Sequence, residues 1–557
     1  MGGLTTASLL ARDGFRVLVL EASHLPGGCS SSYPRKGFVF ESGATTLIGF
    51  DEHQPLARLE KMLGITLPKE PIDPPMTVRM NGEVITRYTD REEWIAEAIR
   101  AFGNEKGQRS FWELAFRVSD TVWRVSEKNV YFPPQNLREW LELAVRNRLK
   151  DIPVLRYAFQ SVRKVMRSCG VDTAAFRSFI DEQLMITAQS KSDDTPFLFG
   201  APGLTYTSST NFYVPGGLLN MVQTLEEYIR SRGGDVRFRS KVTRIQTKKE
   251  YLQEKNADAV GADRAVTGAA VTGATGAAAG AGETGAGEVA TGAAGAGSAA
   301  TGETGAGEAA TGATAATELW DVGYVVSTTS SRYFSRNVIT NLPVWNLPAI
   351  TTGARKEWFE KQASRFRHAW GAFVMGIAVR DEFPPDLTMH HQIHLDSPMT
   401  HTGAESVFVS ISARGDTARA PEGYRVLNIS CHTETDVWFG KPEEYDRTKT
   451  ETGDLILSVL EEKLPGFRKD NVQVQFEGTP VTWQNWVHRH RGRVGGIPQS
   501  MKRSLLDWPP ARTPFKGWYL TGDTVYPGQG IPGVTLGGIN AYWRVVYEQS
   551  HAGIFRQ

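Results

Sequence analysis

The apolar residues near the start of the chain are spaced as in a helix that leads into a strand. Four of them recur at intervals of three or four positions and therefore share one helix face. Gly14 then precedes the run Arg-Val-Leu-Val-Leu at 16–20, whose apolar residues favour a strand. This order of elements is typical of an α/β protein. The four helix residues are Leu4, Ala7, Leu10 and Ala11.

Similar patterns predict strands and helices farther along the chain. Segments 236–246 and 323–327 are expected to contain strands, while segments 406–411 and 426–429 suggest a second sheet. From about 92 to 189 the pattern becomes helical, with many Trp, Leu and Arg residues. The chain is therefore expected to combine two sheets with a substantial helical part.

One segment differs from all the others in composition. Residues 257–317 contain 24 Ala, 15 Gly and 10 Thr among 61 residues, in near-repeats such as Thr-Gly-Ala-Gly-Glu. Such a segment has almost no large apolar side chain to bury, so it cannot offset the entropy lost on ordering. We expect a disordered insert between two ordered parts, and a passive tandem expansion explains it without any function.

Composition excludes several classes of protein. The 62 Lys and Arg against 61 Asp and Glu leave a net charge of +1, so no overall field attracts nucleic acid. No run approaches the roughly 18 apolar residues that a membrane-spanning helix needs. Cys29, Cys169 and Cys431 lie too far apart for a disulfide scaffold. The histidine-rich segment 390–394 has no carboxylate or cysteine at ligand spacing, so we expect no metal site.

The first helix and strand match part of a dinucleotide-binding unit. In that unit a glycine-rich turn opens a helix, and an acidic residue after the next strand binds a ribose hydroxyl. Gly3 matches the last glycine of the turn, and Glu21 matches the acid. The first strand and the first two glycines of the motif are missing. We therefore expect that an apolar strand ending in Gly-x-Gly is encoded upstream of Met1.

Two glycine clusters follow Glu21 directly. Gly27 and Gly28 lie in the sequence Leu-Pro-Gly-Gly-Cys-Ser, which ends at Ser30, and Gly43 lies in the segment 37–46. Such glycines expose backbone N–H groups to a pyrophosphate without steric cost. An ordinary pair of tight turns would use glycine in the same way.

The final part of the chain carries the most specific pattern. The segment 517–523 has the form of a strand that ends in the Gly-Asp turn Gly522-Asp523. The sequence Pro-Gly-Gln-Gly-Ile-Pro-Gly-Val follows at 527–534, and a helix-like pattern follows at 535–545. An aspartate after a strand can accept hydrogen bonds from a sugar-like chain. A helix that begins on glycine directs its positive end toward an anionic group, such as the pyrimidine edge of a reduced flavin.

These motifs together resemble the FAD-dependent carotenoid desaturase and isomerase family, often called phytoene-dehydrogenase-like, within the wider amine-oxidase-type flavoproteins. They follow the family's order over nearly the whole chain, and the Pro-Gly-Gln-Gly-Ile-Pro-Gly ending is fairly specific. The motifs are Gly2-Gly3 with Glu21, Pro26-Gly27-Gly28, Phe40-Glu41-Ser42-Gly43-Ala44, Pro215-Gly216-Gly217, Val242, and Gly522-Asp523 through Gly533-Val534.

The resemblance implies a role for each of these positions. Glu21 would bind the adenosine ribose, and Val242 would hold the adenine through its backbone. The ribityl chain and the flavin ring would be held by Gly522, Asp523 and the helix start at Gly533 and Val534. Cys29 occupies a position that is often Arg in the wider group. The positions implied for the pyrophosphate are Gly2, Gly3, Gly27, Gly28 and Ser30, and Gly43 completes the set expected to bind the cofactor.

The resemblance also implies the fold and the domain organisation. We expect an α/β fold in which a discontinuous, Rossmann-like FAD-binding domain carries an inserted α+β substrate-binding domain. The FAD-binding domain is predicted to comprise residues 1–90, 200–256, 318–345 and 480–557. The substrate domain is predicted to comprise residues 91–199 and 346–479, with a helical part that faces a membrane. The insert 257–317 would extend from the FAD-binding domain.

The expected function is FAD-dependent redox chemistry on a carotenoid-like polyene, either desaturation or cis–trans isomerisation. An FAD-dependent amine oxidase and a cofactor-free scaffold remnant are the alternatives. No catalytic residue is predicted, and the electron acceptor is open. Segment 137–167 combines eight basic with three acidic residues and interleaved apolar ones, which is typical of an amphipathic helix at a membrane surface. We therefore expect a cytoplasmic protein, peripheral on the inner face of a membrane, with no nucleic-acid partner.

Overall fold

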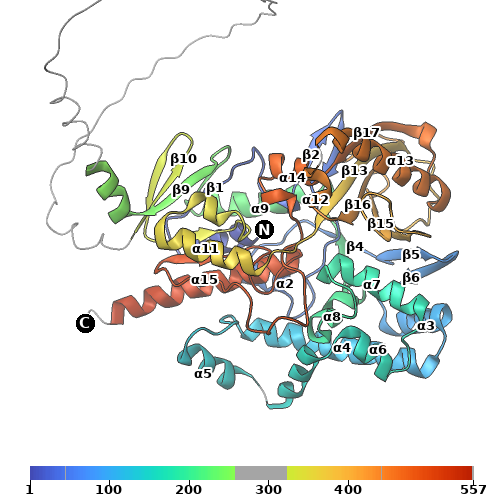
Figure 1. Ribbon diagram of the computed structural model, residues 1–557, viewed down its shortest axis with the longest axis horizontal. Coiled ribbons are helices and arrows are strands. Elements are labelled where there is room, and N and C mark those ends of the chain that lie inside the picture. Colours follow the sequence, from blue (N-terminus) through green and yellow to red (C-terminus); the bar gives the residue numbers. More distant parts are fainter. Residues whose placement is uncertain (44, 148, 257–322, 441, 555–557) are drawn as a thin grey trace, which may run out of the picture.

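Three regions pack together in the computed structural model, which describes residues 1–557 except positions 44, 148, 257–322, 441 and 555–557. They are an α/β region that contains the first and last helices, a seven-stranded sheet, and a layer of helices (Figure 1). The Ala/Gly/Thr-rich segment 257–317, for which we expect disorder, lies outside the described residues.

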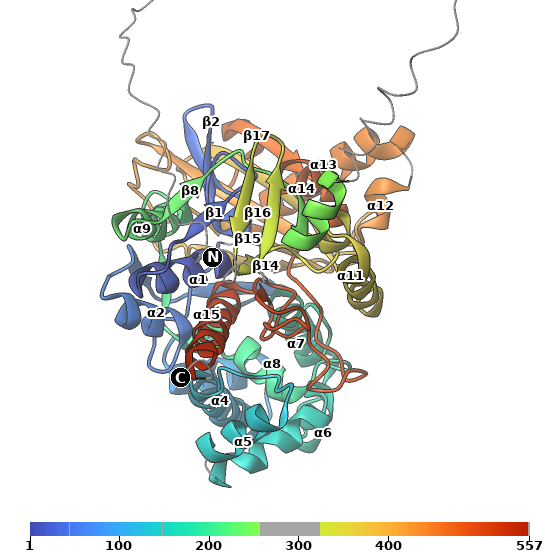
Figure 2. The same ribbon diagram turned by 90° about the vertical axis from the view of Figure 1, so that its left-hand side faces the viewer.

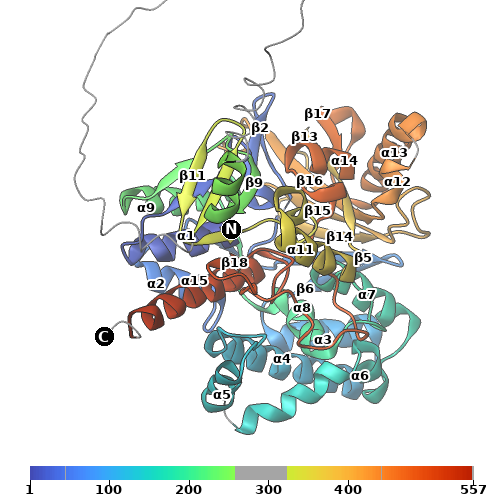
Figure 3. The same ribbon diagram turned by 60° about the vertical axis from the view of Figure 1, so that its left-hand side comes forward.

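The α/β region is built around the helix α1 (Gly2–Arg12), which forms where the apolar spacing predicts it. This helix packs between α9 (Leu218–Ser231) and α15 (Ile531–Ile554), as Figure 3 shows. All three helices contribute to one apolar core, because each presents leucine or isoleucine side chains to the others. A helix from the middle of the sequence and one from its end therefore enclose the first helix.

The parallel strands of the α/β region form two separate pairs. The predicted strand at 16–20 forms β1 (Leu18–Leu20), which pairs with β8 (Asp235–Arg237). Near the end of the chain, β12 (Val338–Thr340) pairs with β18 (Trp518–Leu520). Within the described residues these pairs share no strand. The strand that we expect to be encoded upstream of Met1 stays a prediction.

The segment 236–246 contains two strands. After β8 the chain turns at Arg239, whose φ of 50° is left-handed, and it then continues as β9 (Val242–Thr247). This strand forms an antiparallel sheet with β10 (Tyr324–Thr328) and β11 (Arg332–Ser335). The strand predicted at 323–327 is therefore present as β10.

Several shorter elements complete the α/β region. The hairpin of β2 and β3 follows the glycine pair, and a small antiparallel pair, β4 with β7, precedes α9. The bounds of these elements are η1 (Gly28–Ser30), β2 (Ser32–Arg35), β3 (Phe38–Glu41), α2 (Pro55–Leu63), β4 (Glu70–Ile72), η3 (Tyr206–Ser208), β7 (Asn211–Tyr213), η5 (Leu347–Ile350), α11 (Gly353–Arg365), α14 (Pro480–Trp486) and η8 (His490–Gly492).

The seven-stranded sheet has the order β17-β13-β16-β15-β14-β5-β6 and is antiparallel except for the pair β14·β5. The helix α13 (Tyr445–Lys463) packs on it through Ile456 and Leu460. Segment 406–411 is a strand as predicted, and the strand predicted at 426–429 is longer. The bounds are β5 (Met76–Met80), β6 (Glu83–Arg87), β13 (Gly371–Arg380), β14 (His390–His394), β15 (Ser406–Ile411), β16 (Tyr424–Thr433) and β17 (Val472–Gly478), with α12 (Asp436–Phe439), η6 (Pro442–Glu444) and η7 (Lys469–Asn471) in its connections.

Two strands of this sheet come from early in the chain. Both β5 and β6 belong to the segment 1–90, yet they extend the sheet formed by residues 371–478. The sheet thus crosses the boundary that we predict between the FAD-binding and substrate domains. The division of the chain into domains stays a prediction.

The helical layer, which Figure 2 also shows, covers the end of the sheet at β5 and β6 (Figure 1). Aromatic side chains dominate its core, where Trp94 lies edge to face with Trp112, at 4.9 Å between ring centroids, and stacks on Phe179. No helix of the described residues is long and apolar enough to cross a membrane. The bounds are α3 (Arg91–Phe102), α4 (Glu105–Lys128), α5 (Leu137–Arg146), η2 (Leu149–Phe159), α6 (Val162–Ser168), α7 (Ala174–Ala188) and α8 (Phe197–Leu204).

The prediction of one amphipathic helix over 137–167 is wrong, because the segment is not a continuous helix. The segment forms α5, η2 and α6 instead, because Pro153 lies inside η2 and cannot donate the hydrogen bond that an α-helix requires. Residues Val162, Val165 and Met166 of α6 are buried in the helical core. The exposed apolar side chains are therefore confined to α5 and η2.

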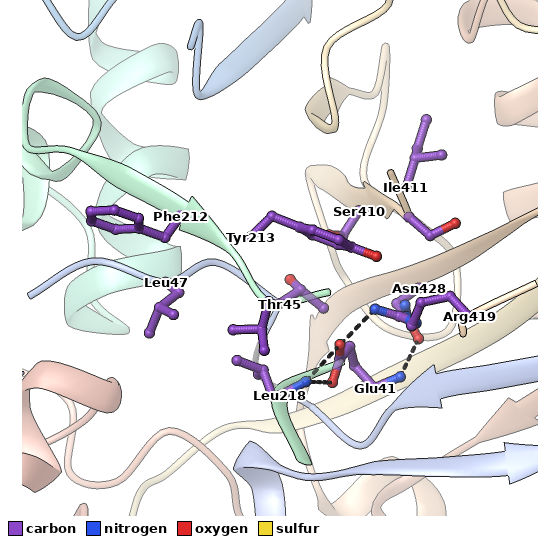
Figure 4. A pocket seen from close by; sticks show the side chains of 12 residues that line it. Glu41, Thr45, Leu47, Phe212, Tyr213, Leu218, Ser410, Ile411, Arg419 and Asn428 are labelled. Carbon is purple, nitrogen blue, oxygen red and sulfur yellow. Dashed lines mark hydrogen bonds and ion pairs between the residues drawn. The ribbon is translucent and has the colours of Figure 1, made fainter. Parts of the chain in front are cut away.

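A buried ion pair joins the α/β region to the seven-stranded sheet. The Arg419 Nη1 lies 2.7 Å from the Glu41 Oε1, and the two side chains are 2% and 6% exposed. Glu41 also accepts a hydrogen bond from the Ser32 hydroxyl at 2.6 Å and one from the Leu218 N–H, at the start of α9. Figure 4 shows the contacts of Glu41 with Leu218, Arg419 and Asn428, where these residues line a small pocket.

We expect Arg419→Met to lower the free energy of unfolding by about 3–5 kcal/mol, because it leaves the Glu41 carboxylate buried without its cation. Urea denaturation followed by tryptophan fluorescence measures the change.

The matched control is Arg447→Met, which removes an exposed pair with Glu444 at 3.7 Å and should cost less than about 1 kcal/mol. Equal unfolding midpoints for the two variants would show that the Glu41–Arg419 pair does not hold the regions together.

Candidate functional site

The start of α1 fits closely against two segments from the end of the chain. A Cβ atom on Gly2 would lie 2.8 Å from the Thr521 Oγ1 and 2.9 Å from the Val534 carbonyl oxygen. The backbone N–H of Gly3 donates to the Asn341 Oδ1 at 3.2 Å. Only glycine fits at position 2, since real Cβ atoms do not approach so closely. The predicted positions Gly2, Gly3 and Val534 are therefore neighbours.

The Gly-Asp turn lies at the same place. Gly522 has a φ of 105°, and a Cβ there would lie 3.1 Å from the Asn341 Oδ1. Asp523 follows directly, and a Cβ on Gly496 would lie 2.1 Å from its carbonyl oxygen. Gly533 and Val534 occupy the first turn of α15, as the sequence predicts. The strand end, the turn and the helix start thus surround the N-terminus of α1.

Glu21 lies directly after β1, where the dinucleotide motif places its acid. The Glu21 N–H donates to the Arg237 carbonyl oxygen at 2.8 Å, and the Glu21 carboxylate accepts from the Ser23 N–H at 2.8 Å. Burial raises the pKa of this carboxyl group. The amino group of Met1 interacts electrostatically with Glu21, Cys29 and Asp523, so all three side chains face the start of α1.

The glycine clusters that follow Glu21 border the same space. Gly27 has a φ of 103°, and a Cβ there would lie 2.8 Å from the Ser30 carbonyl oxygen. Gly28 opens η1 with a φ of 60°, which also favours glycine, and Ser30 ends η1 as a buried residue. A Cβ on Gly43 would lie 3.2 Å from the Cys29 carbonyl oxygen. Gly43 therefore lies against Cys29, the residue that follows the Gly27-Gly28 turn.

Val242 is farther from this centre. It is the first residue of β9 and borders the same apolar cluster as Leu20, the last residue of β1. The neighbouring Ser240 N–H donates to the Glu21 carbonyl oxygen at 2.8 Å. Val242 therefore lies on the Glu21 side of the site.

The structure adds residues that the sequence patterns do not reveal. Among the described residues, the Thr521 Oγ1 and Thr535 Oγ1 are buried without a hydrogen-bond partner. Asn341 contacts both Gly3 and Gly522, and Arg489 pairs with Asp523. The position of Asn341 directly after a short strand could have indicated a site residue. For Arg489 there was none, because a lone arginine between two histidines has no characteristic spacing.

The histidine-rich strand β14 is part of a packed core. Burial lowers the pKa of His390 to about 4, of His391 to about 3 and of His394 to about 4. The His390 Nδ1 lies 2.8 Å from the Ser410 hydroxyl oxygen, and the His391 Nε2 lies 2.9 Å from the Thr388 carbonyl oxygen. In the part of the chain that the structure describes, no three acidic, histidine or cysteine residues are grouped as metal ligands.

Comparisons with known proteins connect this geometry to a family. The chain is 24% identical over 559 residues to a chloroplastic prolycopene isomerase 1 from an Oncidium hybrid cultivar, covering 98% of this chain and 82% of that protein. The prolycopene isomerase of Arabidopsis thaliana is also 24% identical, over 568 residues, covering 98% of this chain and 81% of the relative.

The fold agrees with that of a solved structure. An oxidoreductase from Methanosarcina mazei superimposes with a TM-score of 0.56 at 16% identity, covering 97% of each chain. The expected α/β class, with a Rossmann-like flavin-binding part and an α+β part, is confirmed. A model of the flavin-containing amine oxidoreductases matches residues 1–272 and 319–546. Because this match includes most of the chain, the protein belongs to the flavin-containing amine oxidoreductase family.

Proposed function

We propose that this protein is an FAD-dependent enzyme that acts on a carotenoid-like polyene, by cis–trans isomerisation or by desaturation. The observation that carries the proposal is the similarity to prolycopene isomerases along 98% of the chain. That extent includes both the cofactor motifs and the sheet and helices beyond them. Isomerisation is the favoured reaction, since the relatives similar over this extent are isomerases.

The residues around the start of α1 fit a bound dinucleotide. Glu21 would hold the adenosine ribose, with Val242 near the adenine. The N–H groups of Gly2, Gly27 and Gly28, together with Ser30, would bind the diphosphate. Gly3 would border the diphosphate, while its own N–H donates to the Asn341 Oδ1. Gly43 would let Trp483 and the Cys29 backbone pack closely beside the diphosphate. Gly522, Asp523, Gly533 and Val534 would hold the ribityl chain and the ring. The unpartnered hydroxyls of Thr521 and Thr535 support this fit, because buried polar atoms normally have a partner.

FAD, when bound, would supply a reversible two-electron redox centre beside the polyene. The chain's own part is to bind the substrate, orient it and exclude water. The loop before α15 contacts the end of α7, where the Gln529 Nε2 lies 3.3 Å from the Ile186 carbonyl oxygen. This contact places the helical layer next to the flavin segment. An apolar chain held there would be selected by area burial, and the position of its double bonds would set which bond reacts.

A membrane surface is the second part of the proposal, because a long polyene resides in a bilayer. Seven of the 15 large apolar side chains that are exposed in the described residues lie within 137–159. We name them the α5–η2 patch. In all three views α5 lies at the outer end of the helical layer, away from β17 (Figures 1–3). The patch comprises Leu137, Trp140, Leu141, Val145, Ile152, Leu155 and Phe159.

The helix α5 is oriented with its apolar face outward. Its Glu139 is buried and lies 2.9 Å from the Arg544 Nη1, with side-chain exposures of 8% and 2%. This buried pair fixes the polar face of α5 against α15, so Leu141 and Val145 remain 58% and 85% exposed. Exposed arginines at 138, 146 and 156 surround the patch. An apolar face with a basic rim fits an anionic lipid surface. We therefore propose a cytoplasmic, peripheral location on the inner face of a membrane.

The purified protein should show a flavin absorption spectrum and, with reduced flavin, should convert a poly-cis carotene in vesicles to products of unchanged mass. Chromatography with mass detection separates isomerisation from desaturation, which removes two hydrogens as a hydride and a proton.

Peroxide formation with aliphatic amines is the control for the amine-oxidase alternative. Turnover of amines without any change in the carotene would contradict the polyene assignment. A protein that holds no flavin would contradict the cofactor assignment and favour the scaffold alternative.

The wild-type protein should float with vesicles that contain anionic lipid. We expect the double variant Leu141→Glu/Val145→Glu to bind these vesicles at least about tenfold more weakly, since it charges two side chains that would otherwise be buried in lipid.

The matched control is Val84→Glu/Leu455→Glu, which charges two apolar side chains that are 46% and 40% exposed outside the patch. It should bind vesicles as the wild type does. Equal loss in both double variants would show that the patch is not the lipid-binding surface.

A further inference from the structure

Arg489 brings a buried positive charge to the centre of the proposed cofactor site. It lies between α14 and η8, and its residue is 9% exposed. Its Nη2 lies 2.5 Å from the Asp523 Oδ2, and its Nε donates to the Arg493 carbonyl oxygen. The guanidinium also interacts with the Cys29 side chain. Arg489 thus connects the Gly27-Gly28 turn with the Gly-Asp turn, which are almost 500 residues apart in the sequence.

The backbone around Arg489 is closely packed on both sides. A Cβ on Gly492 would lie 2.0 Å from the Pro480 carbonyl oxygen, and one on Gly496 would lie 2.1 Å from that of Asp523. Both glycines have positive φ values, of 61° and 76°. The segment that carries Arg489 is therefore fixed against α14 and against the Gly-Asp turn, and the guanidinium has little freedom to move toward solvent.

The charges of this region are otherwise mostly negative. Glu21 and Asp523 are carboxylates, and a bound dinucleotide would add the two negative charges of its diphosphate. Cys29 remains an uncharged thiol, because burial raises its pKa, an effect that the neighbouring Arg489 only partly offsets. Burial opposes the charged form of Arg489, but the interactions with Asp523 and Cys29 together outweigh this effect, and the pKa of Arg489 is raised. Arg489 therefore stays a cation in a place where anions gather.

We propose that Arg489 is a cofactor-binding residue whose guanidinium neutralises the diphosphate of the bound FAD, while Asp523 holds that guanidinium in position beside the Gly27-Gly28 turn. This inference rests on the proposed function, since it requires FAD at the site. A guanidinium suits the role because it binds phosphate oxygens through several N–H groups in a fixed plane and keeps its charge when buried.

Binding of FAD to the full chain, freed of flavin, tests the proposal. Quenching of flavin fluorescence gives the dissociation constant for FAD and for riboflavin, which lacks phosphate. We expect Arg489→Gln to weaken FAD binding by about 10- to 100-fold, as for loss of a hydrogen bond to a charged group, and to leave riboflavin binding within about twofold. Binding of FAD by the variant should also depend less on salt concentration than in the wild type.

Two further variants separate a role of Arg489 in FAD binding from a general effect on the structure. Arg491→Gln is the matched control, because Arg491 pairs with the exposed Asp436 at 2.5 Å and should leave FAD binding unchanged. Arg489→Lys keeps the charge and should bind FAD more tightly than Arg489→Gln, and it serves as the test variant if Arg489→Gln does not fold. For Arg489→Lys alone, a loss of FAD affinity that riboflavin does not share supports the proposal.

Unchanged FAD affinity in the Arg489 variants would overturn the inference. An equal loss of affinity for FAD and for riboflavin would also overturn it, because that result indicates a purely structural pair with Asp523. A wild-type protein that binds no FAD is a different result, because it overturns the proposed function itself.

Discussion

The contact between α1 and the end of the chain is the constraint on which the candidate site depends. The Gly2 carbonyl oxygen would lie 2.5 Å from a Cβ at Gly538, and the Thr6 hydroxyl donates to the Gly538 carbonyl oxygen at 2.9 Å. The two helices can approach this closely because α15 carries glycine at the contact, at Gly538. This approach places the N-terminus of α1 between Thr521 and Val534. The other motifs are arranged around that point.

The charges around the site determine which kind of ligand can bind there. Several N–H groups at the start of α1 and in the glycine turns are available to an anion, while Glu21 and Asp523 add negative charge close by. Such an arrangement favours a ligand with both hydroxyl and anionic groups, as a dinucleotide has. The ion pair of Arg489 with Asp523 keeps this balance without exposing either group to water. The geometry of the site therefore agrees with the chemistry of such a cofactor.

Buried ion pairs also fix the position of the substrate region. Glu41 and Arg419 join the hairpin after the glycine turn to the seven-stranded sheet, and Glu139 and Arg544 join α5 to α15. Charged pairs in a low-dielectric interior are costly to break, so each sets a definite arrangement between two regions. In α5 the consequence is unusual: the polar side faces the protein, and the apolar side faces outward. A surface of this kind is expected where a protein meets lipid.

The sequence by itself determined the local elements and the cofactor motifs. The periodicity of Leu4 to Ala11 predicted α1, the apolar run at 16–20 predicted β1, and the glycine and aspartate spacing near 522–534 indicated a flavin segment. These signals are local, because helix faces, strand runs and glycine turns depend on residues close together in the chain. Only the tertiary structure decided that β5 and β6 join the seven-stranded sheet, that the apolar side chains of α6 are buried in the helical core, and that Arg489 meets Asp523. Those features depend on contacts between distant segments, and no spacing in one sequence specifies which distant side chains will meet.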